Sequence, residues 1–397
     1  MKKILLVFWF VVLLSSIVLA EAPFHIGVFS DSVSHGEDTY RGAERLIKEY
    51  GDVKDGGMIT LLTRPDNFMQ EVETVISQIV SFADDPKMKA IVVHAATPGV
   101  VEAFKKIRER RPDILLFAGD VIVDPKMLAD VSDFVVDSDQ ISRGYTIILA
   151  AKKLGADTFM HISFPRHMSM ELKSRRRDIM KEACKDLGLK FIDMACPDPA
   201  SEIGISGGQM FIFEHVPTWL EEYGKKTAFF NTQTAQTEPL IKQIAAFGGI
   251  FIEADTASPT VGYPGAFGIK FEESEKGDWP KILKKVEDAV IEAGGAGRMG
   301  TWTYSFTYSN IAALGEYAKR VVEGTAKLLD KDDFLDALNK YTPGATWNSS
   351  YYVDADGVER KNFFLVYQDT YIFGKGYLNL TSEVIPEKYY DKNIGKN

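Results

Sequence analysis

The chain has 397 residues, 45% of them hydrophobic, and its 46 basic and 56 acidic residues give a net charge of −10. This length allows two domains that each bury a core of their own. The acidic balance argues against nucleic acid and against an anionic membrane surface as partners, because both attract positive charge.

The first twenty residues, MKKILLVFWFVVLLSSIVLA, predict an export signal. Lys2 and Lys3 form a positive start, an apolar run follows, and Val18 and Ala20 occupy the small-residue positions of a cleavage site. The alternative is an uncleaved membrane anchor, for which the 17 residues from Ile4 to Ala20 are at the short limit. In both cases we expect the folded part to work outside the cytoplasmic membrane, in the periplasm, at the cell surface or secreted.

Short apolar runs alternate with amphipathic runs from Phe24 to Asp137, which predicts strands joined by helices. The strands are expected at 25–29, 58–63, 90–95, 114–119 and 133–137. The helices are expected at 39–50, 68–82, 100–110 and 125–129. Continuously apolar strands are buried on both faces, and when helices join them they form a parallel sheet.

The same alternation starts again at Ile141 and predicts a second doubly wound unit. Its strands are expected at 158–163, 190–195, 227–231 and 249–254, and its helices at 141–154, 170–187, 208–223 and 238–247. After Asp255 a Pro- and Gly-rich stretch at 258–268 predicts irregular backbone, and two helices follow at about 279–293 and 304–328. Aromatic segments of β type begin at Tyr351.

Ligands of open parallel sheets bind outside the carboxyl ends of the strands, so the residues that follow each predicted strand are the candidates. In the first unit these are Ser30, Asp31, Ser32, His35, Thr97 and Asp120. Hydroxyls, carboxylates and the free N–H groups of a helix start suit a polar ligand. The alternative is that the Ser and Asp residues only cap helices.

The candidates of the second unit are Phe164, Arg166, Asn231, Thr232, Gln233 and Asp255. Arg166 is expected to hold a ligand anion, because a guanidinium group offers a planar fork of donors. The amides and hydroxyls suit neutral polar groups. Tyr263 and Tyr304 either form a stacking wall beside the ligand or belong to the core. A basic run at 173–177 is typical of a solvated helix face.

Motifs for catalysis and metal binding give no support to an enzyme. Neither H-E-x-x-H nor G-x-x-x-x-G-K-[ST] occurs, and the six histidines are scattered, so we expect no catalytic residue, no metal and no cofactor. The Gly-rich run at 204–208 is interpreted as a turn that opens a helix. Cys184 and Cys196 leave two possibilities open, a disulfide in an oxidising compartment or two buried thiols.

The stretch DFVVDSDQISRGYTIILAAKKLGA (133–156) resembles the crossover between the lobes of type 1 periplasmic binding proteins. In that family a strand ends in Asp, here Asp137, and a Gly opens the next helix, here Gly144. Residues 159–188 resemble the strand, loop and helix that follow, with arginines entering the helix. The likeness covers the order of elements from about 24 to 330, and the chain also resembles an uncharacterised subgroup known only as a domain of unknown function.

This resemblance implies two Rossmann-like α/β lobes, joined by three hinge strands, that trap a ligand when they close. Residues 24–137 with about 255–330 are expected in the first lobe, and 138–254 with part of about 331–397 in the second. The tail from about 340 is longer and more aromatic than the family leads us to expect.

The sequence therefore predicts an exported solute-binding protein with no catalytic step. Its ligand is expected to be a small polar molecule of the amino acid, sugar or nucleoside class, delivered to the membrane permease of an ABC-type uptake system. The alternatives are a sensor or ligand-binding partner of a membrane protein, and a hydrolase that uses Asp120 or His167 as its base.

Overall fold

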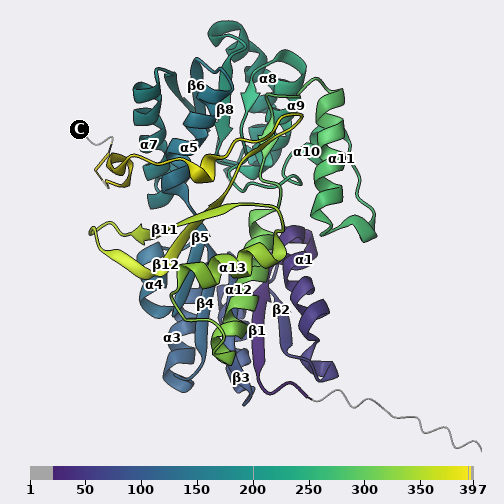
Figure 1. The fold of residues 1–397 in the computed structure, drawn as a ribbon, viewed down its shortest axis with the longest axis vertical. Helices are drawn as coiled ribbons and strands as arrows, with labels where there is room; N and C mark the ends of the chain where they lie inside the picture. Colours follow the sequence, from purple (N-terminus) through teal and green to yellow (C-terminus); the bar gives the residue numbers. More distant parts are fainter. Residues whose placement is uncertain (1–20, 200, 392, 395–397) are drawn as a thin grey trace, which may run out of the picture.

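The computed structural model describes residues 21–199, 201–391 and 393–394, and it places them in two α/β lobes (Figure 1). The predicted export signal lies outside these residues. Among the helices of the described part, none is both long enough and apolar enough to cross a membrane.

The first lobe is built on a seven-stranded sheet in the order β11-β12-β5-β4-β3-β1-β2. All neighbours pair in parallel except β11, which is antiparallel to β12. The strands are β1 (His25–Ser30), β2 (Ile59–Thr63), β3 (Met88–Ala96), β4 (Leu115–Val121), β5 (Phe134–Ser138), β11 (Trp347–Val353) and β12 (Glu359–Gln368). Both β1 and β5 are buried at every position. This burial explains why the sequence shows continuous apolar runs there and not an alternating pattern.

Helices cover both faces of this sheet. One face packs against α2 (Val72–Ser81), α3 (Val100–Arg110) and α4 (Pro125–Val131), and the other against α1 (Val33–Tyr50), α12 (Phe306–Glu323) and α13 (Lys331–Tyr341). The helix α12 is buried nearly all round, because α1 and α13 both pack on it. Gly42 of α1 permits this contact, since a side chain there would strike Ile311 of α12.

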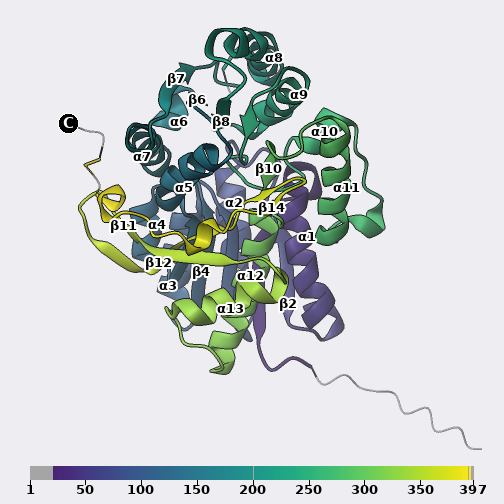
Figure 2. The same ribbon diagram turned by 45° about the horizontal axis from the view of Figure 1, so that its top comes forward.

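The second lobe has a four-stranded parallel sheet in the order β7-β6-β8-β9. Its strands are β6 (Thr158–Ser163), β7 (Lys190–Ala195), β8 (Thr227–Asn231) and β9 (Ile250–Phe251). The helices α5 (Gln140–Lys153) and α7 (Glu171–Leu187) lie together on one side, and α8 (Gly204–Tyr223) and α9 (Thr237–Phe247) on the other (Figure 2). A single turn, α6 (Pro165–Met168), precedes α7.

The segment after Asp255 is divided between the lobes, whereas the sequence placed all of 255–330 in the first. The helices α10 (Tyr263–Phe267) and α11 (Trp279–Glu292) pack on the core of the second lobe, because α11 presents Val286 and Val290 to it. Of the helices α10, α11 and α12, the last packs in the core of the first lobe. In the tail, β12 pairs with β5 and extends the first sheet.

The strands β10 (Gly300–Thr301), β13 (Tyr371–Ile372) and β14 (Gly376–Tyr377) form a small antiparallel sheet. It lies beside the crossings, the segments in which the chain passes from one lobe to the other. The predicted strand at 249–254 is shortened to two residues, because Glu253 and Ala254 turn toward the hinge. There Arg143 donates to Glu253 Oε1 at 2.8 Å, to the Ala254 carbonyl at 2.8 Å and to the Asp255 carbonyl at 2.9 Å.

One buried ion pair links the places where the chain passes between the lobes. Arg143 of α5 also donates to Ser138 Oγ at 2.8 Å, at the end of β5. The other oxygen of Glu253 accepts from Trp302 Nε1 and from Thr370 Oγ1, each at 2.9 Å. The Arg143–Glu253 pair therefore joins the crossings near 138, 302 and 370.

Candidate functional site

The carboxyl ends of the first-lobe strands bring a buried ion pair to the side that faces the second lobe. Asp31 follows β1 and Arg64 follows β2, and they pair with side chains that are 9% and 4% exposed. Burial, only partly offset by the charge of Arg64, raises the pKa of Asp31. Arg64 was not among the predicted site residues. It directly follows the predicted strand at 58–63, so the expectation that ligands bind at the carboxyl ends of strands applied to it as well.

Several buried polar atoms beside this pair have no hydrogen-bond partner within the described residues. They are Ser30 Oγ at the end of β1, Thr97 Oγ1 after β3, both ring nitrogens of His94, and Nε and Nη1 of Arg64. Ser30, His94 and Thr97 are fully buried. Burial and the nearby charge of Arg64 lower the pKa of His94 to about 3, so this ring is neutral at pH 7.

Two carboxyl groups lie side by side at the ends of β4 and β5. Gly119 and Val136 are paired in register, so Asp120 and Asp137, the next residue of each parallel strand, are neighbours. Burial and the charge of Asp31 raise the pKa of Asp120 to about 6. Burial and the charge of Asp120 raise the pKa of Asp137 well above its usual range.

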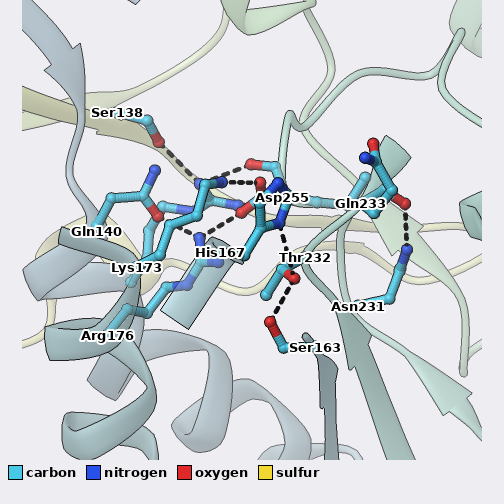
Figure 3. Close-up of polar contacts among 12 residues, drawn as sticks. Ser138, Gln140, Ser163, His167, Lys173, Arg176, Asn231, Thr232, Gln233 and Asp255 are labelled. Atoms are coloured by element: carbon cyan, nitrogen blue, oxygen red, sulfur yellow. Dashed lines mark hydrogen bonds and ion pairs between the residues drawn. The ribbon is translucent and has the colours of Figure 1, made fainter. Parts of the chain in front are cut away.

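The second lobe contributes mainly positive charge, from α7 (Figure 3). Lys173 pairs with Asp255 Oδ2, and Arg176 Nη1 lies 2.6 Å from Asp255 Oδ1. Although burial raises it, the charges of Arg176 and Lys173 hold the pKa of Asp255 well below its usual range. The charges of Lys173 and Asp255 also act on the pKa of Asp120, so these two groups of the second lobe lie near the end of β4.

The loop after β8 is held by its own polar side chains. Asn231 Nδ2 donates to the Gln233 carbonyl at 2.6 Å and to Thr237 Oγ1 at 3.1 Å, which fixes the start of α9. Thr232 Oγ1 lies 2.7 Å from Ser163 Oγ and 3.1 Å from His167 Nδ1 (Figure 3). Burial, followed by the charge of Lys173, lowers the pKa of His167 to about 4.

Ser32 and His35 organise the start of α1. Ser32 is the N-cap residue, and its hydroxyl accepts from the His35 N–H and donates to Asp66. The exposed His35 ring packs edge-on against Phe68, with 5.2 Å between ring centres. Ser32 thus has the capping role that formed the alternative for this loop, and His35 packs against Phe68.

The contacts correct the role predicted for Arg166 and decide between the two alternatives left open for Tyr263 and Tyr304. Arg166 does not offer a free guanidinium, because Nε and Nη2 each donate to an oxygen of Asp198 at 2.8 Å and its side chain is 50% exposed. Tyr263 belongs to the core and donates to the Gly300 carbonyl at 2.6 Å. Tyr304 packs beside Trp279 and donates to the Pro343 carbonyl at 2.8 Å.

Phe164 lies inside the second lobe at 1% exposure, with its ring 4.2 Å from the ring of His167. It packs against the histidine in the interior of the second lobe. Lys173 and Arg176 belong to the basic run that the sequence pattern assigned to a solvated face. Their spacing of three residues on α7 places them on one side of the helix, but Arg177, four residues from Lys173, has the same relation, so the spacing did not single them out.

The cysteines are both free and buried, so the possibility of two buried thiols is confirmed.

The Gly-rich run at 204–208 has the spacing G-x-S-x-G, but it forms the first turn of α8, well separated from the end of β7. The nucleophile elbow that uses this spacing requires a sharp turn directly between strand and helix. Within the described residues, no group of three or more His, Cys, Asp or Glu side chains could hold a metal ion.

A protein family known as DUF3798, described as a protein of unknown function, matches residues 24–300. The chain belongs to the DUF3798 family. This confirms the resemblance to a subgroup known only as a domain of unknown function. A second family matches residues 311–392.

Relatives of this DUF3798 chain occur in Treponema pallidum (strain Nichols). One uncharacterized protein is 39% identical over 223 residues, which are 56% of this chain and all of the relative. Another is 42% identical over 183 residues, 46% of this chain and 83% of that protein.

A solved structure shares the fold, and a second one is more distantly similar. A crystal structure from Clostridium difficile 630, named as a candidate transcriptional regulator, has a TM-score of 0.76 and 22% identity over 88% of this chain and 99% of that chain. The solute-binding protein of an ABC transporter from Rhodopseudomonas palustris HaA2, in complex with p-hydroxybenzoic acid, has a TM-score of 0.49 and 12% identity over 89% of this chain and 95% of that chain. The predicted α/β architecture with two parallel sheets is confirmed.

Proposed function

We propose that this chain is an exported binding protein that holds a small polar ligand between its lobes and releases it unchanged. The proposal follows from the place where the buried charges gather. Asp31, Arg64 and Asp120 on the first lobe face Lys173 and Asp255 on the second. A ligand that contacts both sets would favour the closed arrangement of the lobes by its contacts to each.

The observation that carries the proposal is the group of unpartnered polar atoms on the first lobe. Ser30 Oγ, Thr97 Oγ1 and two nitrogens of Arg64 are buried and form no hydrogen bond with any residue that the structure describes. An unsatisfied buried polar atom costs about 1–3 kcal/mol, and native proteins contain few of them. Gathered at the carboxyl ends of β1, β2 and β3, these atoms suit a ligand that supplies both acceptors and donors.

The cellular part of the proposal has a separate basis. The apolar run and the cleavage-site residues within 1–20 support export across the cytoplasmic membrane. Delivery of the ligand to a membrane permease is the role that the predicted binding-protein resemblance implies, and a membrane-bound sensor could use the same closed state. A neighbouring gene for a permease or for a histidine kinase would separate these two partners.

A thermal-shift screen of the purified protein against amino acids, sugars and nucleosides tests the binding function. A ligand at one hundred times its dissociation constant should stabilise the folded state by about 2.7 kcal/mol. Mass spectrometry of each stabilising compound after incubation would reveal any turnover. Conversion of the compound would favour the hydrolase and contradict the proposal.

A pair of matched variants locates the site. Thr97→Val removes a buried hydroxyl that has no hydrogen-bond partner within the described part of the chain, so the ligand-free protein should keep its stability while ligand-induced stabilisation falls. Thr301→Val is the control, because Thr301 is equally buried and unpartnered but belongs to the small sheet of β10. If both variants respond to the ligand as the unaltered protein does, the ligand does not bind beside Thr97.

A further inference from the structure

We infer that the ligand carries a positively charged amino group, which lies against the carboxyl groups of Asp120 and Asp137. This inference rests on the proposed function and narrows it to one chemical class. Among the small polar molecules that the sequence left open, it selects those with a protonated amine.

The geometry of the two carboxyl groups is the first argument. They lie at the ends of neighbouring parallel strands, one residue beyond the paired Gly119 and Val136. Asp137 is 6% exposed, and its Oδ1 accepts from the Ser138 N–H at 2.7 Å. Asp120 has a φ of 52°, in the left-handed region that few residues other than glycine adopt and that recurs at functional sites.

The charge balance between the lobes is the second argument. The charged groups beside Asp120 and Asp137 are Asp31, Arg64, Lys173 and Asp255, and Arg176 joins them through its ion pair with Asp255. Together with Asp120 and Asp137 they make four carboxyl groups and three cations. Arg143 and Glu253 compensate each other, and burial keeps His94 and His167 neutral. If all four carboxyl groups were ionised, one negative charge would have no counter-charge; without a ligand, the raised pKa values of Asp137 and Asp120 mean that a proton held by this pair neutralises it.

A buried charge without a partner is costly, so it is neutralised by a proton or by a cation. The cations present are already committed, since Arg64 pairs with Asp31 while Lys173 and Arg176 both pair with Asp255. In contrast, Asp120 forms no ion pair with any described residue within 4.0 Å. Burial first, and the charge of Asp31 second, raise the pKa of Asp120 to about 6, so this carboxyl takes up a proton more readily than an exposed one.

An ammonium group fits this place better than a metal ion. It carries a single positive charge and donates three hydrogen bonds, which two carboxyl groups can accept. A calcium ion would require six or more oxygen ligands. Nearby, the unpartnered Nε and Nη1 of Arg64, a side chain that is 4% exposed, can donate to an acceptor on the same ligand.

Pairs of compounds that differ only in the amine provide the test. Each amino acid is screened by thermal shift beside its 2-hydroxy acid, glucosamine beside glucose, and putrescine beside butane-1,4-diol. Only amine-bearing members should raise the melting temperature of the protein. Their affinity should fall at least tenfold when the pH is lowered from 7.5 to 5, because protonation of Asp120 removes the charge that the ammonium contacts.

Variants separate this inference from the proposed function. Asp120→Asn and Asp137→Asn should each weaken amine binding at least tenfold, whereas Asp356→Asn, an exposed aspartate paired with Lys126, should not. Tight binding of a neutral partner compound, or amine binding unaffected in both variants, would overturn the inference and leave the proposed function standing. If no compound of any pair binds, the proposed function fails for these classes and the inference fails with it.

Discussion

Replacing Glu253 by glutamine should destabilise the folded protein by about 3–5 kcal/mol, the cost of breaking a buried ion pair by removing one charge. The side chains of Arg143 and Glu253 are 1% and 2% exposed, so the guanidinium charge would remain buried without compensation. Glutamine also has one acceptor oxygen, whereas the carboxylate accepts from Arg143, Trp302 and Thr370. At least one of these donors would lose its partner.

Urea denaturation of the ligand-free protein at pH 7 measures the effect as a change in the free energy of unfolding. The matched control is Arg166→Met, which breaks the ion pair with Asp198. Because the Arg166 side chain is 50% exposed, its loss should cost less than about 1 kcal/mol. The contrast between a buried and an exposed arginine pair isolates the contribution of burial.

A double variant, Arg143→Met with Glu253→Leu, should be more stable than Glu253→Gln alone, because it leaves no charge buried without a partner. The double variant should remain less stable than the unaltered protein, because Trp302 and Thr370 still lose the oxygen to which they donate. If Glu253→Gln is no more destabilising than Arg166→Met, the hinge is not held by this ion pair and the reasoning is wrong.

Three further outcomes follow from the contacts of single side chains. Because burial lowers the folded-state pKa of His94 to about 3, the unfolded chain takes up the proton first, and stability should fall by about 1.4 kcal/mol per pH unit below pH 6.5; pH-dependent denaturation of His94→Gln should lack this part of the fall, and an unchanged slope would contradict it. Arg166→Ala should leave ligand affinity unaltered in calorimetry, since Asp198 already occupies that guanidinium. A thiol reagent should label Cys184 and Cys196 only after unfolding, because both are buried and burial raises their pKa values to about 12 and about 11; rapid labelling of the native protein would show that these sites open.

The order of the main strands and helices was predictable because the local spacing of hydrophobic residues indicates each element. Continuous apolar runs such as 25–29 and 90–95 became buried strands, and amphipathic runs such as 100–110 became the helices that cover them. The expectation that ligands bind at the carboxyl ends of strands also placed Ser30, Thr97 and Asp120 at the edge where the lobes face each other. Each of these conclusions depends on neighbours within a few residues of each other in the chain.

What only the tertiary structure decided is which charged groups meet. Arg166 and Arg64 both follow strands, yet Asp198 engages the first at the surface while Asp31 holds the second in the interior. The tail gave no local sign that β12 would pair with β5. The sequence by itself therefore determined the elements and their alternation, because periodicity is a local property. Pairing across 110 residues, as between Arg143 and Glu253, was settled only when folding brought distant segments together and burial selected the charges that could neutralise each other.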